Sequence, residues 1–266
     1  MKAFLGIFLA LLGFVSCEST EVRDPSNVIV VEAYLYAGQP VKDVRLKRLN
    51  EVAVNEGLYI NDALVTVLWR GNRYPLEQDS QEEGNYLYEG NELEVMEGEQ
   101  YGLEIRYNGV LITASTRVPM RPSNVRLSSG TMFLRENDGL VQPGNNFVSL
   151  VWDNPDSANF IVTTKSVVEE EEKIPFEEGN ILLTLLNIRG TLTTKEEQVV
   201  YDVNFQKYGT NQVTLMAVDS PYVEFFGGNN PEIEHLLRDP TNIENGTGIF
   251  SGIATDTSFI LLIPAE

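Results

Sequence analysis

The sequence predicts an all-β protein made of two β-sandwich domains in tandem, with a short helical insertion near the C-terminus. Short segments of alternating apolar and polar residues recur along the chain, and such segments separated by turn residues are typical of sandwiches. Asn108-Gly109 joins two of them, and this dipeptide favours a two-residue hairpin turn. Hydrophobic residues make up 42% of the 266 residues, which is enough for packed cores and excludes a disordered chain.

The first domain is expected at residues 27–120. Residues 27–36 alternate and are rich in β-branched side chains, which predicts the first strand. Further strands are expected at 63–69, 85–88, 100–107 and 110–116, whereas 41–56 fits neither the helical nor the strand period. Pro119 and Pro122 mark the domain boundary, because proline cannot donate to a strand ladder.

The second domain is expected at residues 121–266. Its predicted strands are 125–127, 133–134, 147–152, 159–164, 181–188, 199–205, 212–218 and 259–263. Val148, Leu150 and Trp152 share one face before a proline-containing turn, which resembles the second and third strands of an immunoglobulin or fibronectin III-like sandwich. Residues 219–252 differ, since their apolar residues suit short helical pieces followed by a loop rich in Gly and Asn. We expect a helical and loop insertion there.

The N-terminus indicates export and membrane anchoring. Met1-Lys2 supplies a positive start, and the apolar run from Ala3 to Val15 covers only ~20 Å as a helix, less than a bilayer core. It ends at Ser16-Cys17, which holds the only cysteine of the chain. The segment resembles a bacterial lipoprotein signal, which implies that residues 1–16 are a signal peptide, that Cys17 is the lipid attachment site and that residues 17–26 form a tether. A plain cleaved signal and an uncleaved anchor are the alternatives.

Composition excludes several function classes. The net charge is −20, with 39 acidic and 19 basic residues, which argues against nucleic acid as a partner. With Cys17 lipidated, no thiol remains for disulfides or cysteine-based metal sites. His235 is the only histidine, so a site with two histidine ligands is excluded. We predict no catalytic residues, no metal site and no cofactor, and therefore not an enzyme.

Three motifs have simple structural interpretations. Glu169–Glu172 lacks the spacing of a calcium loop and suits a solvated hairpin tip. Asn245–Gly248 lacks the ending of a phosphate loop and suits a tight turn. The aromatic residues of the first domain are either core or a platform for stacking sugars, and they are Trp69, Tyr74, Tyr86 and Tyr88.

The long segment 220–252 is the predicted site of partner contact, because loops on a rigid scaffold often carry function. Aromatic side chains in such a segment are candidate hot spots for binding. The predicted contact residues are Tyr222, Phe225, Phe226, Asn242, Asn245 and Phe250. The alternative is that these residues plug one end of a sandwich.

Several segments give the chain a resemblance to a known family. They are Val28–Ala33, Asn61–Val67, Glu97–Ile105, Thr113–Pro119 and Pro240–Phe250. In this order they resemble the Bacteroidetes lipoproteins that share domain of unknown function 4249, and the likeness spans about residues 28 to 252. The resemblance implies an outer-membrane lipoprotein that accompanies TonB-dependent transporters, and it implies no ligand or catalytic residue.

We therefore expect a lipid-anchored outer-membrane protein that acts by binding, as an accessory to a TonB-dependent transporter. One alternative is a structural or adhesive, fimbria-like surface subunit, which would need an exposed edge and a detachable terminal strand. Another is a surface protein that binds or processes glycans.

Overall fold

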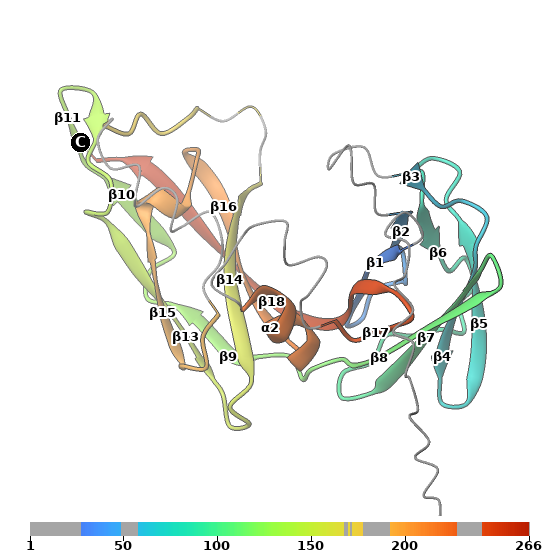
Figure 1. Ribbon diagram of the computed structural model, residues 1–266. Coiled ribbons are helices and arrows are strands. Elements are labelled where there is room, and N and C mark those ends of the chain that lie inside the picture. The colour runs from blue at the N-terminus through green and yellow to red at the C-terminus, as the bar shows by residue number, and fades with distance from the viewer. Residues whose placement is uncertain are drawn as a thin grey trace, which may run out of the picture.

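The computed structural model is an all-β protein and describes residues 28–48, 58–167, 170, 172–177, 192–227 and 241–265. In these residues helix is limited to α2 (Ser220–Phe226) and a 3-10 turn, η2 (Asp202–Asn204). Figure 1 shows two groups of strands joined by a long C-terminal strand. The strands are β1 (Ile29–Tyr36), β2 (Asp43–Arg48), β3 (Leu58–Tyr59), β4 (Leu64–Trp69), β5 (Asn72–Gln78), β6 (Asn85–Leu87), β7 (Gln100–Tyr107), β8 (Val110–Arg117), β9 (Ser123–Leu127), β10 (Thr131–Leu134), β11 (Glu136–Asn137), β12 (Leu140–Val141), β13 (Phe147–Asp153), β14 (Asn159–Ser166), β15 (Glu197–Tyr201), β16 (Gly209–Val218), β17 (Ile243–Glu244) and β18 (Thr247–Pro264).

The N-terminal half forms by antiparallel pairing of β1 to β8. β1 pairs with β2, and β7 pairs with both β4 and β8. Alternation explains which face is buried, as in β4, where Val65, Val67 and Trp69 lie in the core. The strands predicted at 27–36, 63–69, 85–88, 100–107 and 110–116 are confirmed within two residues. The part of 41–56 that is described holds β2, and β5 is a strand that the sequence did not predict.

The predicted hairpin between β7 and β8 is confirmed. Tyr107 pairs with Val110 across the turn, and Asn108 and Gly109 have φ of 48° and 79°. Both values lie in the left-handed region that a type I′ turn requires.

Replacing Gly109 with Ala should lower the free energy of unfolding by about 1–2 kcal/mol, because a side chain strains a backbone of positive φ. A Cβ at Gly109 would meet no atom within 4 Å, so the effect comes from the backbone alone. Gly130→Ala is the matched control, since its Cβ site is equally empty and its φ is not positive. Urea denaturation of both variants measures the difference, and an equal response would contradict the turn assignment.

The C-terminal half contains a three-stranded sheet and the end of the 13-stranded sheet. The order β15-β13-β9 forms one sheet, and β14, β16 and β18 belong to the other. Trp152 of β13 and Phe160 of β14 meet edge to face with ring centroids 5.4 Å apart, which joins the two layers. The strand predicted at 199–205 ends instead at Tyr201 and continues as η2. The strand ends there because Asp202 is buried, and its carboxylate accepts hydrogen bonds from the backbone N–H groups of Gly144 (2.6 Å) and Asn146 (3.0 Å).

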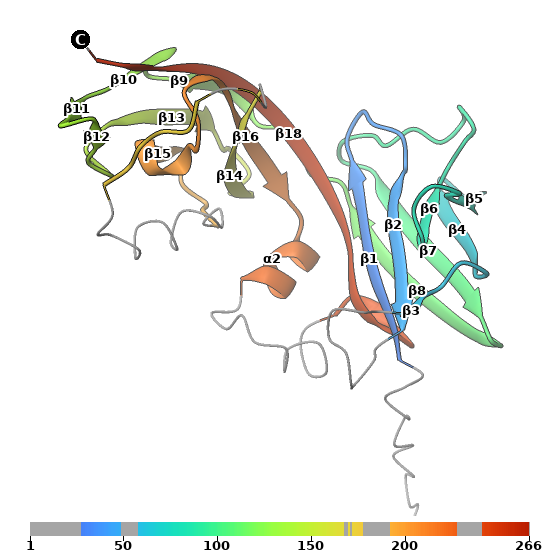
Figure 2. The ribbon, with the colours of Figure 1, turned by 90° about the horizontal axis from the view of Figure 1, so that it is seen from above.

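β18 connects the two halves. It pairs with β1 in parallel as far as Ile253 and with β16 antiparallel from Ile253 to Leu262. Near its end it also pairs in parallel with β10. One curled sheet of 13 strands therefore runs through the molecule, and Figure 2 shows β18 passing from one group of strands to the other. The C-terminal strand is a structural part of both halves.

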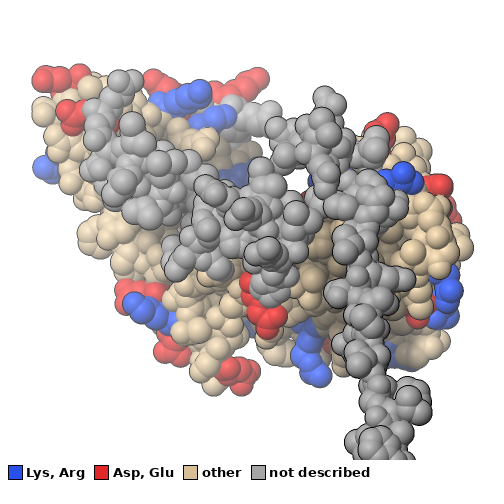
Figure 3. Space-filling view, in the orientation of Figure 1, with Lys and Arg blue, Asp and Glu red and all other residues tan. Residues whose placement is uncertain are grey.

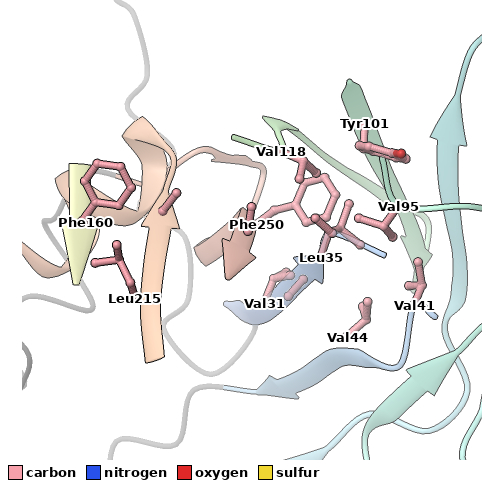
Figure 4. Close-up of a cluster of buried hydrophobic side chains, with 14 of the residues drawn as sticks. Val31, Leu35, Val41, Val44, Val95, Tyr101, Val118, Phe160, Leu215 and Phe250 are labelled. Carbon is pink, nitrogen blue, oxygen red and sulfur yellow. The ribbon is translucent and has the colours of Figure 1, made fainter. Parts of the chain in front are cut away.

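The start of β18 corrects the sequence prediction. Residues 242–250 were expected to be a loop and 259–263 the last strand, but β18 already begins at Thr247. The glycines there allow close backbone approach: a Cβ at Gly248 would lie 2.0 Å from the Val31 carbonyl oxygen, and one at Gly252 would lie 2.6 Å from the Val118 Cα. Phe250 is 0% exposed, and Figure 4 shows its ring beside Leu35 and Val118 in the core of the N-terminal half.

Other predictions fall partly or wholly outside the described residues. The signal segment 1–16, Cys17 and the tether 17–26 are among them, as are the predicted strand 181–188 and His235. No helix in the described part of the chain is both long and apolar enough to span a membrane.

Candidate functional site

The helix α2 lies beside the middle of β18, where the two halves meet (Figure 2). Its N-cap is Asp219, whose side chain accepts the backbone N–H of Tyr222 at 3.1 Å, and Pro221 occupies an early helical position. Both features are typical helix starts. The Asp219-Ser220-Pro221 sequence is therefore the local signal for this helix, which ends with the Gly227 N–H bonded to the Val223 carbonyl at 2.7 Å.

The carboxylate of Asp219 joins three segments that are far apart in the sequence. Its Oδ1 accepts the Ser251 hydroxyl of β18 at 2.6 Å, and its Oδ2 accepts the Thr116 hydroxyl of β8. The Gly252 N–H donates to Thr116 Oγ1 at 2.9 Å and to Asp219 Oδ2 at 3.2 Å. Asp219, Thr116 and Ser251 are all buried. We call these three side chains the Asp219 cluster.

The Asp219 cluster suits a structural role. Every donor to the carboxylate is a neutral group, namely the hydroxyls of Ser251 and Thr116 and two backbone N–H groups. A carboxylate beside a hydroxyl can act as the base that activates a nucleophile, but all three side chains here are buried, which leaves the hydroxyls inaccessible to a substrate. The cluster was not predicted from the sequence, since its members are brought together only by the fold.

Aromatic side chains gather on and beside α2. Tyr222 and Phe226 have ring centroids 4.6 Å apart, and Phe225 and Phe226 have centroids 4.9 Å apart. Phe226 is 48% exposed, whereas Tyr222 and Phe225 are half-buried. The structure thus brings these three predicted residues together on one helix.

Two tyrosines of β1 extend this group. Burial raises the pKa of Tyr34 above its usual range, and the electrostatic effect of Tyr222 raises this pKa further. Burial also raises the pKa of Tyr36, with Asp43 and Tyr222 adding to the shift. Burial raises the pKa of Tyr222 itself. We name the five side chains the aromatic surface: Tyr34, Tyr36, Tyr222, Phe225 and Phe226.

Alternation along β1 is the signal for its two members of the aromatic surface. Val31, Ala33 and Leu35 are buried in the core, so Tyr34 and Tyr36 lie on the opposite face of the same strand. Neither tyrosine was singled out from the sequence, because nothing local indicates that α2 packs near that face.

The other three predicted contact residues lie at the junction of β8 and β18. The Asn242 side chain accepts the Phe250 N–H at 3.0 Å and donates to the carbonyls of Phe250 (2.7 Å) and Ser115 (2.9 Å). Asn245 donates to the Leu111 carbonyl at 3.0 Å and has φ of 62°. These side-chain amides link β8 to the residues at and before the start of β18 through hydrogen bonds to backbone groups. Because Phe250 is fully buried, its ring packs the core and is not presented to a partner.

The remaining motifs form no site among the described residues. Trp69 is buried and stacked on Tyr101, with centroids 5.9 Å apart. The buried Tyr86 donates its hydroxyl to the Ile60 carbonyl at 2.9 Å, so these two rings are core. No group of three metal-binding side chains occurs in the part of the chain that is described, and Glu169 and Glu171 lie outside it. Figure 3 shows acidic and basic residues interspersed over the described surface of one face.

Comparison with known proteins finds a matching family model and a number of solved structures. The model of the family described as "Domain of unknown function (DUF4249)" matches residues 18–258. No curated protein matches the chain. A solved structure titled "Crystal structure of chicken CNTN1 FN1-FN3 domains" is 12% identical with a TM-score of 0.21, and the match covers 89% of this chain but only 65% of that one.

Proposed function

This chain belongs to the DUF4249 family, and from this premise we propose that it is an outer-membrane lipoprotein, anchored through Cys17, that acts by binding. Its role is accessory to a TonB-dependent transporter, and it has no catalytic function. The family match begins at Glu18, directly after the cysteine that the signal-like segment ends on. That position supports a body attached to a lipidated Cys17.

The proposal also covers the architecture. Two β-sandwich units occupy residues 27–120 and 121–266, and the two units share β18. The Trp152–Phe160 contact between layers supports the second sandwich. The pairing of β18 with both β1 and β16 supports a shared strand.

The aromatic surface is the observation that carries the binding role. Three of its rings stand on a short helix that is fixed at its start by the Asp219 cluster, and the other two stand on β1, so they are presented on a rigid base. Phe226 remains 48% exposed although it packs against two other rings. Exposed aromatic side chains on rigid supports are typical centres of protein interfaces.

The adhesive alternative finds less support. Exchange of a terminal strand requires one that can detach. β1 is paired on both sides, with β2 and β18, and β18 is paired with β1, β16 and β10 in turn. Removing either strand would break the core of the N-terminal half, because Val31, Leu35 and Phe250 lie there.

Replacing Phe226 with Asp should reduce capture of a TonB-dependent transporter about tenfold or more, as expected when a central aromatic contact is removed. A tagged full-length copy is crosslinked in its native membranes and purified, and co-purified proteins are quantified by mass spectrometry. Phe147→Asp is the matched control, since Phe147 is also an exposed phenylalanine but lies on β13. It should capture as much transporter as the unaltered protein.

Two results would contradict the proposal in different ways. Absence of any transporter from the unaltered sample would refute the accessory role. Equal capture of the transporter by the Phe226 and Phe147 variants would keep the accessory role but show that the aromatic surface does not contact the transporter. Capture of further copies of this chain would favour the structural alternative.

A further inference from the structure

A row of exposed side chains crosses the N-terminal half at one end. Leu64 of β4 lies opposite Arg106 of β7, and Arg106 lies opposite Leu111 of β8. Leu64 is 71% exposed, and Leu111 and its neighbour Val110 are exposed as well. Arg106 is exposed between the two leucines. We call Leu64, Arg106 and Leu111, which share one face of the sheet, the tether-end surface. Adjacent exposed apolar side chains of this kind mark contact sites.

This surface lies where the N-terminal segment joins the folded body. The Leu111 carbonyl accepts the side-chain amide of Asn245 at 3.0 Å. Gly246, the next residue, lies so close to β1 that its Cβ would be 3.1 Å from the Ile29 carbonyl oxygen. Ile29 is the first residue of β1. The start of the fold and Leu111 of the tether-end surface therefore both lie against the same two residues, Asn245 and Gly246.

The distance to the proposed anchor is short. The residues between Cys17 and Ile29 reach at most about 40 Å when fully extended. A bilayer that holds the lipid chains of Cys17 is therefore always within reach of this end of the body. The opposite end of the molecule, at β10, lies far from β1 in both ribbon views (Figures 1 and 2).

The charges at this end are compatible with lipid phosphates, although the chain as a whole is acidic. Arg106 and Arg48 form no ion pair with a carboxylate among the described residues, and Arg48 instead contacts Tyr107, with its guanidinium carbon 5.2 Å from the ring centroid. The carboxylate of Glu104 is engaged by Arg73 at 2.5 Å, and that of Glu244 accepts the Thr113 hydroxyl at 2.7 Å. Asp62 is the exposed carboxylate nearest to Leu64 along the chain, and its negative charge opposes attraction to lipid phosphates. Docking therefore depends more on apolar contact than on charge.

We propose that the tether-end surface rests on the membrane to which the chain is anchored, with its apolar side chains in the headgroup region and Arg106 beside lipid phosphates. This rests on the lipid anchor of the proposed function. Interfacial binding grows with buried apolar area and with attraction to anionic lipid. A small surface is too weak to hold a protein by itself, but a tether raises its effective concentration at the membrane. Docking would orient the body and hold the aromatic surface in one direction.

Single-cysteine labelling tests the docking directly, because the chain has only one cysteine and lipidation removes its thiol. Leu64→Cys in the full-length, membrane-purified protein is labelled with an environment-sensitive fluorophore and reconstituted into vesicles of phosphatidylethanolamine and phosphatidylglycerol. We expect the emission of the label to be several-fold higher in vesicles than in the same protein free of detergent and vesicles. Lipids that carry a nitroxide near the headgroup should strongly quench this emission. Phe133→Cys is the matched control, since Phe133 is 59% exposed but lies on β10. Its label should report water throughout.

The outcomes separate the docking from the anchor. If the protein floats with the vesicles but the Leu64 label reports water, the docking proposal is wrong and the anchor stands. If the unaltered protein takes up label at Cys17 or fails to float, the anchor is wrong, and the docking falls with it. A rise in emission that depends on protein concentration and not on vesicles would identify a second copy of this chain as the occupant and would also overturn the proposal.

Discussion

Replacing Asp219 with Ala should lower the free energy of unfolding by about 3 kcal/mol or more, because it leaves buried donors without an acceptor. The hydroxyls of Ser251 and Thr116 and the N–H groups of Gly252 and Tyr222 all bond to this carboxylate. The change also removes the N-cap of α2, which is worth about 1 kcal/mol by itself. The melting temperature should fall by about 6–12 °C for a chain of this size, as measured by calorimetry or circular dichroism.

Glu224→Ala is the matched control for Asp219. Glu224 is an exposed acid on the same helix, so its removal should change the free energy of unfolding by less than about 0.5 kcal/mol. A similar response of the two variants would mean that the Asp219 cluster does not hold the two halves together. The Asp219 variant should also lose transporter capture in the crosslinking experiment, since α2 presents the aromatic surface.

Replacing Phe250 with Ala should destabilise the protein by about 3–5 kcal/mol, the usual effect of deleting a buried aromatic ring. Phe250 is 0% exposed and belongs to the main hydrophobic cluster. Its ring fills the core of the N-terminal half although it comes from the last strand (Figure 4). Backbone amide exchange should therefore become faster in β1 and β8 than in β14.

Phe259→Ala is the control for Phe250, because the two residues are of one type and lie on the same strand, β18. Phe259 is 58% exposed, and its loss should change the free energy of unfolding by less than about 0.5 kcal/mol. If the Phe250 variant speeded exchange equally in β1 and β14, its ring would not belong to the N-terminal core. Equal stability of the two variants would contradict the position of β18.

Most strands were predictable because their signal is local. In β4 and β7, alternation alone indicates which residues are buried, and the structure buries Val65, Val67, Leu103 and Ile105 as the pattern requires. Asn108-Gly109 specified its turn through backbone conformation, which needs no distant contact. Short helical pieces were expected in residues 219–252, but the start of α2 at Asp219-Ser220-Pro221 and the hydrogen bonds of Asp219 to β8 and β18 were not predicted.

The first part of β18 was missed because its residues are unusual for a strand. Gly246, Gly248 and Gly252 favour a turn on propensity alone, and they are present because β1, β8 and β18 approach closely there. Of the six predicted contact residues, Tyr222, Phe225 and Phe226 meet on α2, whereas Asn242, Asn245 and Phe250 join β8 to β18. Composition could not separate these two groups, since exposure depends on what the rest of the chain covers.

The all-β class, the positions of most strands, the β7–β8 hairpin and the membership in a family could all be inferred from the amino-acid sequence. These properties follow from side-chain periodicity and backbone preference, which act over a few residues. The tertiary structure was needed to show that the C-terminal strand completes the N-terminal half, that a buried carboxylate joins α2 to β8 and β18, and that three aromatic side chains meet on α2 beside them. The physical reason is that pairing and burial between residues more than a hundred positions apart leave no trace in local sequence patterns.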